Sequence, residues 1–175
     1  MAMPEQQTIP VRIQLTADDY AEFNRYHGRR QMALLFFLYW IVFVAVAGMR
    51  GGAADAGRFG LLIPAGLVLS GLLIAMHLWS IKVKTRKLFQ NDKLAQMEQQ
   101  LHFSETGIRH TTAESSNLVE WADVYRAAET RNELILYLAR NRAILVPKRD
   151  IGAQWQQVKE LLRTHLPPRK LGLKS

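Results

Sequence analysis

Two long apolar runs in the N-terminal half give the chain its strongest pattern. Residues 32–49 contain no charged side chain, and residues 59–81 contain none when His77 is neutral. A helix rises about 1.5 Å per residue, so roughly 20 apolar residues cross the hydrocarbon core of a bilayer. Two core helices of a soluble domain are the alternative, but runs of this length without a polar face argue against it. The pattern predicts a transmembrane hairpin over residues 32–81, with the short link 50–58 between its spans.

Basic residues beside the two spans predict their orientation. Residues 25–30 hold three arginines before the first span, and a basic cluster follows the second. The members of this cluster are Lys82, Lys84, Arg86 and Lys87. Lys and Arg next to a span are retained on the cytoplasmic side. We therefore expect a multi-pass protein of the cytoplasmic membrane, with both termini in the cytoplasm and the link outside.

Polarity alternates before the first span and then takes helical spacing. Apolar and polar side chains alternate over residues 9–15, which predicts a half-buried strand. Thr16 follows, with Asp18 and Asp19 in the next turn, and these residues favour a helix N-terminus. Residues 1–31 are thus predicted to form a cytoplasmic strand and an amphipathic helix over 16–30, with a break at Gly28 as one alternative.

The pattern changes from helical to strand-like after the spans. A connecting helix is expected over residues 82–97, where a weak apolar stripe continues from the second span. Residues 98–167 then form one domain of short strands that ends in a helix over 152–166. The predicted strands are 99–104, 108–113, 117–121, 124–130, 134–139 and 142–147. Pro167 and Pro168 stop the helix, and we expect the basic tail 168–175 to be disordered.

Several short motifs lie along these elements in a recognisable order. They are IQLTADDY at 13–20, GI at 107–108, ESS at 114–116, WADV at 121–124, LILYL at 134–138 and ILVPKR at 144–149. In this order they resemble the YcxB-like family of bacterial membrane proteins over nearly the whole chain. The chain departs from that family at Ile151 and Gly152, where relatives carry an aromatic residue and a Ser or Thr cap.

The resemblance implies an inner-membrane protein with an α+β domain below its helical hairpin, and no active site. The domain would be similar to pleckstrin-homology folds, with a bent antiparallel sheet of about six to seven strands and a C-terminal helix as its cap. Residues 9–15 lie on the same side of the membrane as the six strands predicted after the hairpin. We therefore hypothesise that this strand adds to an edge of the C-terminal sheet, so that the domain folds across the hairpin.

Charge is concentrated in the C-terminal half of this chain of net charge +8. Residues 82–175 hold 17 Lys and Arg against 10 Asp and Glu. A basic domain fits either anionic lipid headgroups or nucleic acid. The cluster at 82–87 directly follows a span, so we expect lipid or a protein partner and no nucleic acid. Lys148 and Arg149, after the last strand, are further candidates for contacts with an anionic headgroup or a partner.

The sequence offers little to catalysis or metal binding. Cysteine is absent, and His102, Glu105 and His110 lack the spacing of known metal motifs. Ser115 and Ser116 lie in a predicted turn without the motif of a nucleophile elbow. We expect Trp121 and Trp155 to be core partners, with Trp121 packed under the closing helix. His77 is best explained as an interfacial residue rather than a relay, because neither span contains an acid.

These observations predict no enzyme and no cofactor. The first function class is a membrane-anchored cytoplasmic module that binds a protein, peptide or lipid headgroup, or acts as a scaffold. The alternative is an accessory subunit or a small oligomeric transporter or channel component that acts through its spans. Gly66 and Ser70 form a small-residue pair that lets helices approach closely, and such a pair packs either the two spans or two molecules. Packing within the molecule is the preferred prediction, and a homo-oligomer stays open.

Overall fold

The structure is a computed structural model and describes residues 8–50, 56–91 and 96–173. The chain forms two compact units. One unit joins the chain up to Phe23 with the chain from Lys87 onward, and we call it the sheet domain. The other unit is Asn24–Arg86, which we call the helix pair. The sheet domain is therefore assembled from both ends of the sequence.

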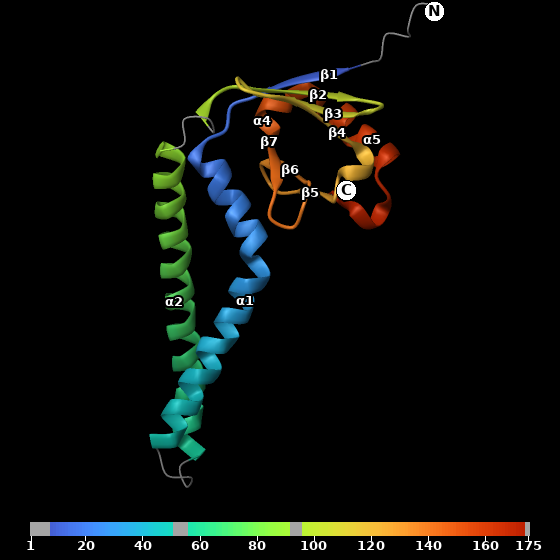
Figure 1. Cartoon of the computed structure of the whole chain (residues 1–175). Coiled ribbons are helices and arrows are strands. Elements are labelled where there is room, and N and C mark those ends of the chain that lie inside the picture. The colour runs from blue at the N-terminus through green and yellow to red at the C-terminus, as the bar shows by residue number, and fades with distance from the viewer. Residues whose placement is uncertain (1–7, 51–55, 92–95, 174–175) are drawn as a thin grey trace, which may run out of the picture. The chain divides into compact units, whose positions relative to one another are not determined.

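Helices α1 (Ala17–Arg50) and α2 (Ala56–Asn91) make up the helix pair and extend beyond it (Figure 1). Both are long and apolar enough to cross a membrane. In the most apolar window of each helix, 0% of α1 and 11% of α2 is buried. Core helices of a soluble domain would be mostly buried, so this exposure suggests membrane association. Helix α1 continues through Gly28 without a break, and residues 51–55 of the predicted link lie outside the described residues.

Small residues of α2 bring the two helices together within the helix pair. A Cβ atom at Gly66 would lie 2.7 Å from the Phe43 side chain and 3.1 Å from Trp40. Ser70, one turn further on, is 1% exposed, whereas a Cβ at Gly71 would meet nothing within 4 Å. The Gly66–Ser70 pair therefore packs against α1, which confirms packing within the molecule.

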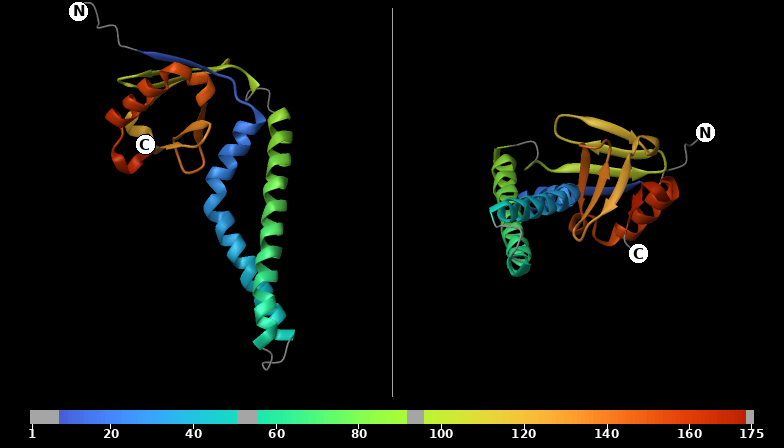
Figure 2. Two further views of the ribbon diagram at one scale, coloured as in Figure 1. Left: turned by 180° about the vertical axis from the view of Figure 1, so that it is seen from behind. Right: turned by 90° about the horizontal axis from the view of Figure 1, so that it is seen from below.

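Within the described part of the sheet domain, eight strands form two four-stranded sheets, whose arrangement can be followed in Figures 1 and 2. The first has the order β1-β2-β3-β4 and the second the order β7-β6-β5-β8. The strands of the first sheet are β1 (Ile9–Ile13), β2 (Gln99–Ser104), β3 (Gly107–Thr111) and β4 (Ser116–Glu120). Those of the second are β5 (Arg126–Glu129), β6 (Glu133–Tyr137), β7 (Ala143–Pro147) and β8 (Leu171–Gly172).

The expectation of one bent sheet is wrong, because the chain leaves the first sheet after β4. A 3-10 turn, η1 (Trp121–Asp123), separates β4 from β5, and these two strands do not pair. Trp121 is buried and its indole Nε1 donates to the carbonyl oxygen of Ser104 at 3.0 Å. Trp121 was predicted to end the strand, but this contact directs its side chain into the core. The next strand, β5, then belongs to the second sheet.

Strand β1 joins the sheet of the C-terminal half, as hypothesised. It runs antiparallel to β2, with Ile9 opposite Phe103 and Ile13 opposite Gln99. Val11 and Ile13 are buried while Arg12 is exposed, so the predicted alternation points its apolar side chains into the core. Residues from the two ends of the chain therefore share one hydrophobic core.

The closing helix covers that core in three segments. Helix α4 (Lys148–Ile151) and the 3-10 turn η2 (Gly152–Gln154) lead into α5 (Trp155–His165). Gly152 has φ +55°, a conformation that favours glycine, and it permits the turn between α4 and η2. The largest apolar side chains of the core that are less than 2% exposed are Ile13, Leu101, Phe103, Ile108, Val124, Leu134, Leu136, Val146, Val158 and Leu162.

The C-terminal tail is ordered as far as Leu173, so the prediction of a disordered tail is wrong for these residues. After a 3-10 turn, η3 (Pro168–Lys170), strand β8 pairs in parallel with β5. Lys170 Nζ donates to the carbonyl oxygen of Val124 at 2.7 Å, and Leu171 packs against the core. Two-residue strands are too short for a periodic signal, which is why the pattern missed β8. The predicted connecting helix is α2 as far as Asn91, and residues 92–95 lie outside the described residues.

Candidate functional site

Arg149, one of the candidate ligand-binding cations, is engaged inside the sheet domain. Its Nη1 donates to Oδ1 of Asp19 at 2.7 Å, and its Nη2 donates to Oδ2 at 2.6 Å. The same Nη2 donates to the carbonyl oxygen of Gln14 at 3.0 Å. A guanidinium that binds both carboxylate oxygens is a strong and directional pair. These hydrogen bonds with Asp19 raise the pKa of Arg149.

Asp19 also caps the N-terminus of α1. Its Oδ2 accepts hydrogen bonds from the backbone N–H of Thr16 at 2.7 Å and from the Thr16 hydroxyl at 2.8 Å. This is a capping box with aspartate as its acid. Burial by itself would raise the pKa of Asp19, but the hydrogen bonds from Arg149 and Thr16 outweigh it, and the pKa is lowered. The carboxylate is therefore held ionised at the start of α1.

A second pair of contacts fixes the next turn of α1 to the sheet domain. Glu22 accepts hydrogen bonds from the backbone N–H of Asn132 at 3.2 Å and from its side-chain Nδ2 at 2.8 Å. The rings of Phe23 and Tyr137 lie beside these residues, with centroids 6.1 Å apart. We call Asp19, Glu22, Arg149 and Asn132 the α1 anchor. It joins residues that are 110 to 130 positions apart in sequence.

Lys148, the other cation after β7, belongs to a small charged cluster with Glu129 and Lys159. Its Nζ donates to Oε1 of Glu129 at 2.6 Å and to the carbonyl oxygen of Thr130 at 3.1 Å. Lys159 Nζ lies 3.7 Å from the other Glu129 oxygen, and both of these side chains are less than 9% exposed. The Trp155 ring lies beneath the two ammonium groups, 5.0 Å and 6.0 Å from its centroid. Lys148 is thus also paired internally, and its contact with a headgroup stays a prediction.

The basic cluster after the second span lies on α2, with all four side chains exposed. Thr85, within the same stretch, is buried and accepts a hydrogen bond from Asn24 Nδ2 at 3.0 Å. Contact with anionic headgroups by Lys82, Lys84, Arg86 and Lys87 is untested and stays a prediction.

The residues considered for metal binding or nucleophilic chemistry are held by separate structural contacts. His110 Nε2 lies 2.7 Å from Oε1 of Gln99, and Glu105 lies 2.8 Å from His165 Nε2. Burial, together with the charge of Arg142, lowers the pKa of His110. Among the described residues, no three His, Asp or Glu side chains gather as metal ligands. Ser115 lies in the β3–β4 turn, where its carbonyl oxygen accepts from Thr112 N at 2.8 Å, so the prediction of a turn is confirmed for Ser115, whereas Ser116 is the first residue of β4.

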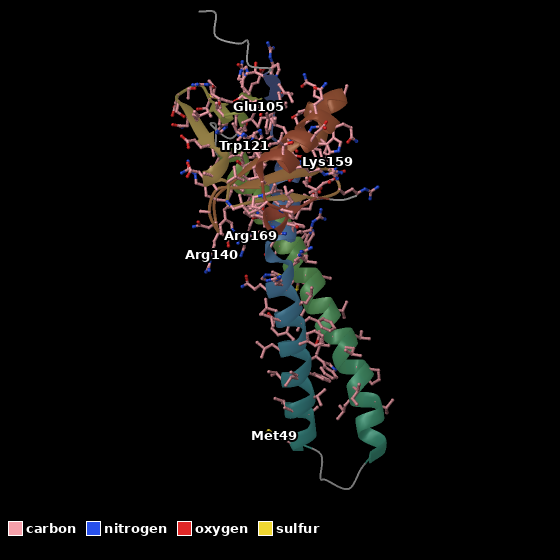
Figure 3. All side chains as sticks on the ribbon, turned by 90° about the vertical axis from the view of Figure 1, so that its right-hand side faces the viewer. Met49, Glu105, Trp121, Arg140, Lys159 and Arg169 are labelled. Atoms are coloured by element: carbon pink, nitrogen blue, oxygen red, sulfur yellow. The ribbon has the colours of Figure 1, made fainter. Side chains whose placement is uncertain are left out.

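Trp121 packs under the closing helix as predicted, and Trp155 is the first residue of α5. The Trp121 ring stacks on the His165 ring of α5, with centroids 5.2 Å apart and planes 6° apart. Trp155 is partly buried against the same core. Figure 3 labels Trp121, and it shows Lys159 on the closing helix. The sequence could predict these positions because each tryptophan falls at an apolar position of its predicted strand or helix.

A groove of about 430 Å³ opens between α5 and the first sheet. Its helical side carries Gln154, Gln157, Glu160 and Thr164, and its sheet side carries Thr8 and Glu105. Ile9 and Leu161 add apolar surface. A local sequence pattern cannot reveal this concave surface, because the groove depends on where the chain at Thr8 and Ile9 meets the closing helix.

The sequence also missed the partners of the two cations. Asp19 appeared only as a helix-start residue, since nothing in a local pattern links it with a residue 130 positions away. Glu129 gave only a weak signal in the sequence, because it is a single acid that follows two alanines at 127–128. Buried acids of this kind are usually paired with a cation.

The comparison with known families supports the resemblance for the motifs between residues 107 and 149, whereas the motif at 13–20 lies outside the matched residues. Residues 103–162 match the family model described as YcxB-like protein. The match begins in β2 and ends in α5, so β1, β8 and both long helices lie outside it. No curated protein matches the chain. Over residues 103–162, which lie in the sheet domain, the chain is thus similar to the YcxB-like family.

Proposed function

We propose that the protein is a membrane-anchored binding or scaffold module without catalytic activity. Its sheet domain would hold a partner in the cytoplasm, while its two long helices hold the domain at the membrane. The observation that carries this proposal is the α1 anchor, because it makes the start of a membrane helix part of the domain. A domain that only needed a tether could end in a flexible linker.

The anchor makes the first turns of α1 part of the sheet domain. Asp19, Glu22 and Phe23 occupy these turns, and they contact Arg149 of α4, Asn132 before β6 and Tyr137 of β6. The same helix runs on to Arg50. A partner bound to the domain would therefore be held by a unit that contains the start of this helix, as expected of a membrane-anchored scaffold.

The pairing of β1 with β2 supports the proposed topology. A strand pair cannot form across a bilayer, so Ile13 and Gln99 must lie on one side. Two spans between them satisfy this condition. The basic residues of 25–30 and 82–87 then favour the cytoplasmic side, in the inner membrane of a bacterium.

The finer likeness to pleckstrin-homology folds is part of the same proposal. Two four-stranded sheets with a helix over the core are compatible with that architecture. Such domains are known as binding modules rather than enzymes, and this favours binding over catalysis by analogy of fold alone.

Chemical crosslinking in intact membranes, followed by a pull-down of the full chain, tests the proposal. We expect one reproducible protein partner whose crosslinks map to the sheet domain. A ladder of homo-oligomers together with ion flux in vesicles would instead support a transporter or channel component. Reporter enzymes fused after residue 54 and at the C-terminus test the topology, and two cytoplasmic readings would overturn it.

A further inference from the structure

We propose that the groove between α5 and β1 binds a short, extended, basic segment of a partner protein. The proposal rests on the proposed function and names the partner class for it. The groove belongs wholly to the sheet domain and has a volume of about 430 Å³, which suits a few residues of an extended peptide better than a folded domain.

The charge of the groove selects its ligand. Glu105 and Glu160 line it, and no Lys, Arg or His is among its described lining residues. This composition is opposite in sign to the chain as a whole, which carries +8. An anionic headgroup would face two carboxylates without a cation, so lipid is disfavoured here. An ammonium or guanidinium group would form charge-assisted hydrogen bonds.

Both carboxylates remain accessible to a ligand. Glu160 is exposed on α5, and the Glu105 side chain is 64% exposed although it pairs with His165. The remaining polar lining consists of glutamine and threonine, which both donate and accept hydrogen bonds. Such side chains suit the peptide groups of an extended chain, and Ile9 and Leu161 suit its aliphatic side chains.

The position of β1 gives the ligand its extended form. Strand β1 is the end strand of its sheet, and among the described residues no strand pairs with its outer edge. At one end of this edge, Gln14 N donates to Asp150 and its carbonyl oxygen accepts from Arg149. The other end, at Thr8 and Ile9, borders the groove. A short peptide can therefore add main-chain hydrogen bonds at that end, as in strand addition.

Pro10 limits how far such a strand can extend. Backbone groups of an antiparallel strand alternate between its two neighbours, and Gln14 faces away from β2. Pro10 has the same parity, so its missing N–H falls on the outer edge. A long strand would lack a donor there, which also protects the edge against aggregation. We therefore expect a ligand of few residues, held chiefly by side chains.

Binding of a defined peptide by the full chain in detergent micelles tests the proposal. The probe is a short fluorescein-labelled peptide in which Lys alternates with Val and Thr, and its twin carries Glu at every Lys. We expect the Lys peptide to bind at low salt and the Glu peptide not to bind. Equal binding of both peptides, or no binding of either, would overturn the proposal.

Groove variants with matched controls locate the site. Glu160→Gln and Glu105→Gln should each raise Kd about two- to fivefold, as expected for exposed charge pairs. Glu114→Gln, in the exposed β3–β4 turn, should leave Kd unchanged. Gln157→Lys should abolish binding. Gln156→Lys changes the preceding residue, which is outside the groove lining, and should reduce binding far less. A Gln157→Lys variant that still binds the probe contradicts the assignment.

The membrane pull-down separates this inference from the proposed function. If the partner is captured equally by the wild type and by Gln157→Lys, the binding module stands and the groove is not its site. If the wild type captures no partner, the proposed function itself fails.

Discussion

The Asp19 carboxylate has two roles: it caps the N-terminus of α1 and it binds Arg149. Its side chain is 6% exposed and its oxygens accept from both Arg149 and Thr16. Removing the charge leaves the guanidinium without its carboxylate and weakens the helix cap. A single substitution of Asp19 therefore weakens both the ion pair and the helix cap.

Asp19→Asn should destabilise the sheet domain by about 1–3 kcal/mol, the sum of a helix cap and a half-exposed ion pair. Urea unfolding of the full chain in micelles, followed by tryptophan fluorescence, measures the loss. Asp18→Asn changes the neighbouring exposed acid and should have a much smaller effect. Arg149→Gln in the Asp19→Asn background should add little, and full additivity would show that the pair is not coupled.

His110 makes the stability of the domain sensitive to pH. Burial and the charge of Arg142 lower its folded pKa below the ordinary value of 6.5, so the unfolded chain binds the proton more readily. Stability from this group is present above pH 6.5 and is lost as pH falls through the folded pKa. His110→Gln should remove this part of the pH dependence of unfolding, and Arg142→Gln should weaken it. An unchanged slope in His110→Gln would contradict this account.

Gly66 sets the approach of the two long helices at the scale of elements. A Cβ at this position meets Phe43 at 2.7 Å, so any side chain must push the helices apart or displace the ring. Gly66→Val should lower stability in an SDS titration by about 1–3 kcal/mol, as overpacking does. Gly71→Val is the matched control, since a Cβ at Gly71 meets nothing within 4 Å. Equal effects of the two substitutions would mean that helix propensity, rather than contact, decides.

The elements themselves could be predicted well from sequence. Each of the strands β2 to β7 falls within a few residues of its prediction, because alternation and turn residues act locally. The division into two sheets could not be predicted, since it depends on the indole of Trp121 reaching Ser104. The groove and the pairing of Arg149 with Asp19 depend in the same way on contacts between distant segments.

The whole molecule depends on a strand at its N-terminal end. Val11 and Ile13 are buried, and they enter a core whose other buried members come from residues 101–166. Burial of each such side chain contributes about 1.5–3 kcal/mol, which together is a large part of the stability of a small domain.

Deleting residues 1–15 should therefore unfold the sheet domain while both long helices remain. Limited proteolysis of the full chain and of the deletion in micelles measures this, with rapid cleavage expected between residues 99 and 166 of the deletion. Val11→Ser with Ile13→Ser should have the same effect, and Arg12→Ser with Gln14→Ser should have much less. A deletion variant as resistant as the wild type would contradict the shared core.

The pairing of β1 with β2 also sets the order of events during synthesis. The ribosome makes β1 first, but its partner follows only after residues 14–98, which include both long helices. Under the proposed topology, the domain can be completed only when the chain before α1 and the chain after α2 lie on the same side of the membrane. Insertion of one helix without the other would place β1 and β2 on opposite sides, leave β1 unpaired and expose the domain to proteases. Completion of the fold would then report that the two strands lie on one side.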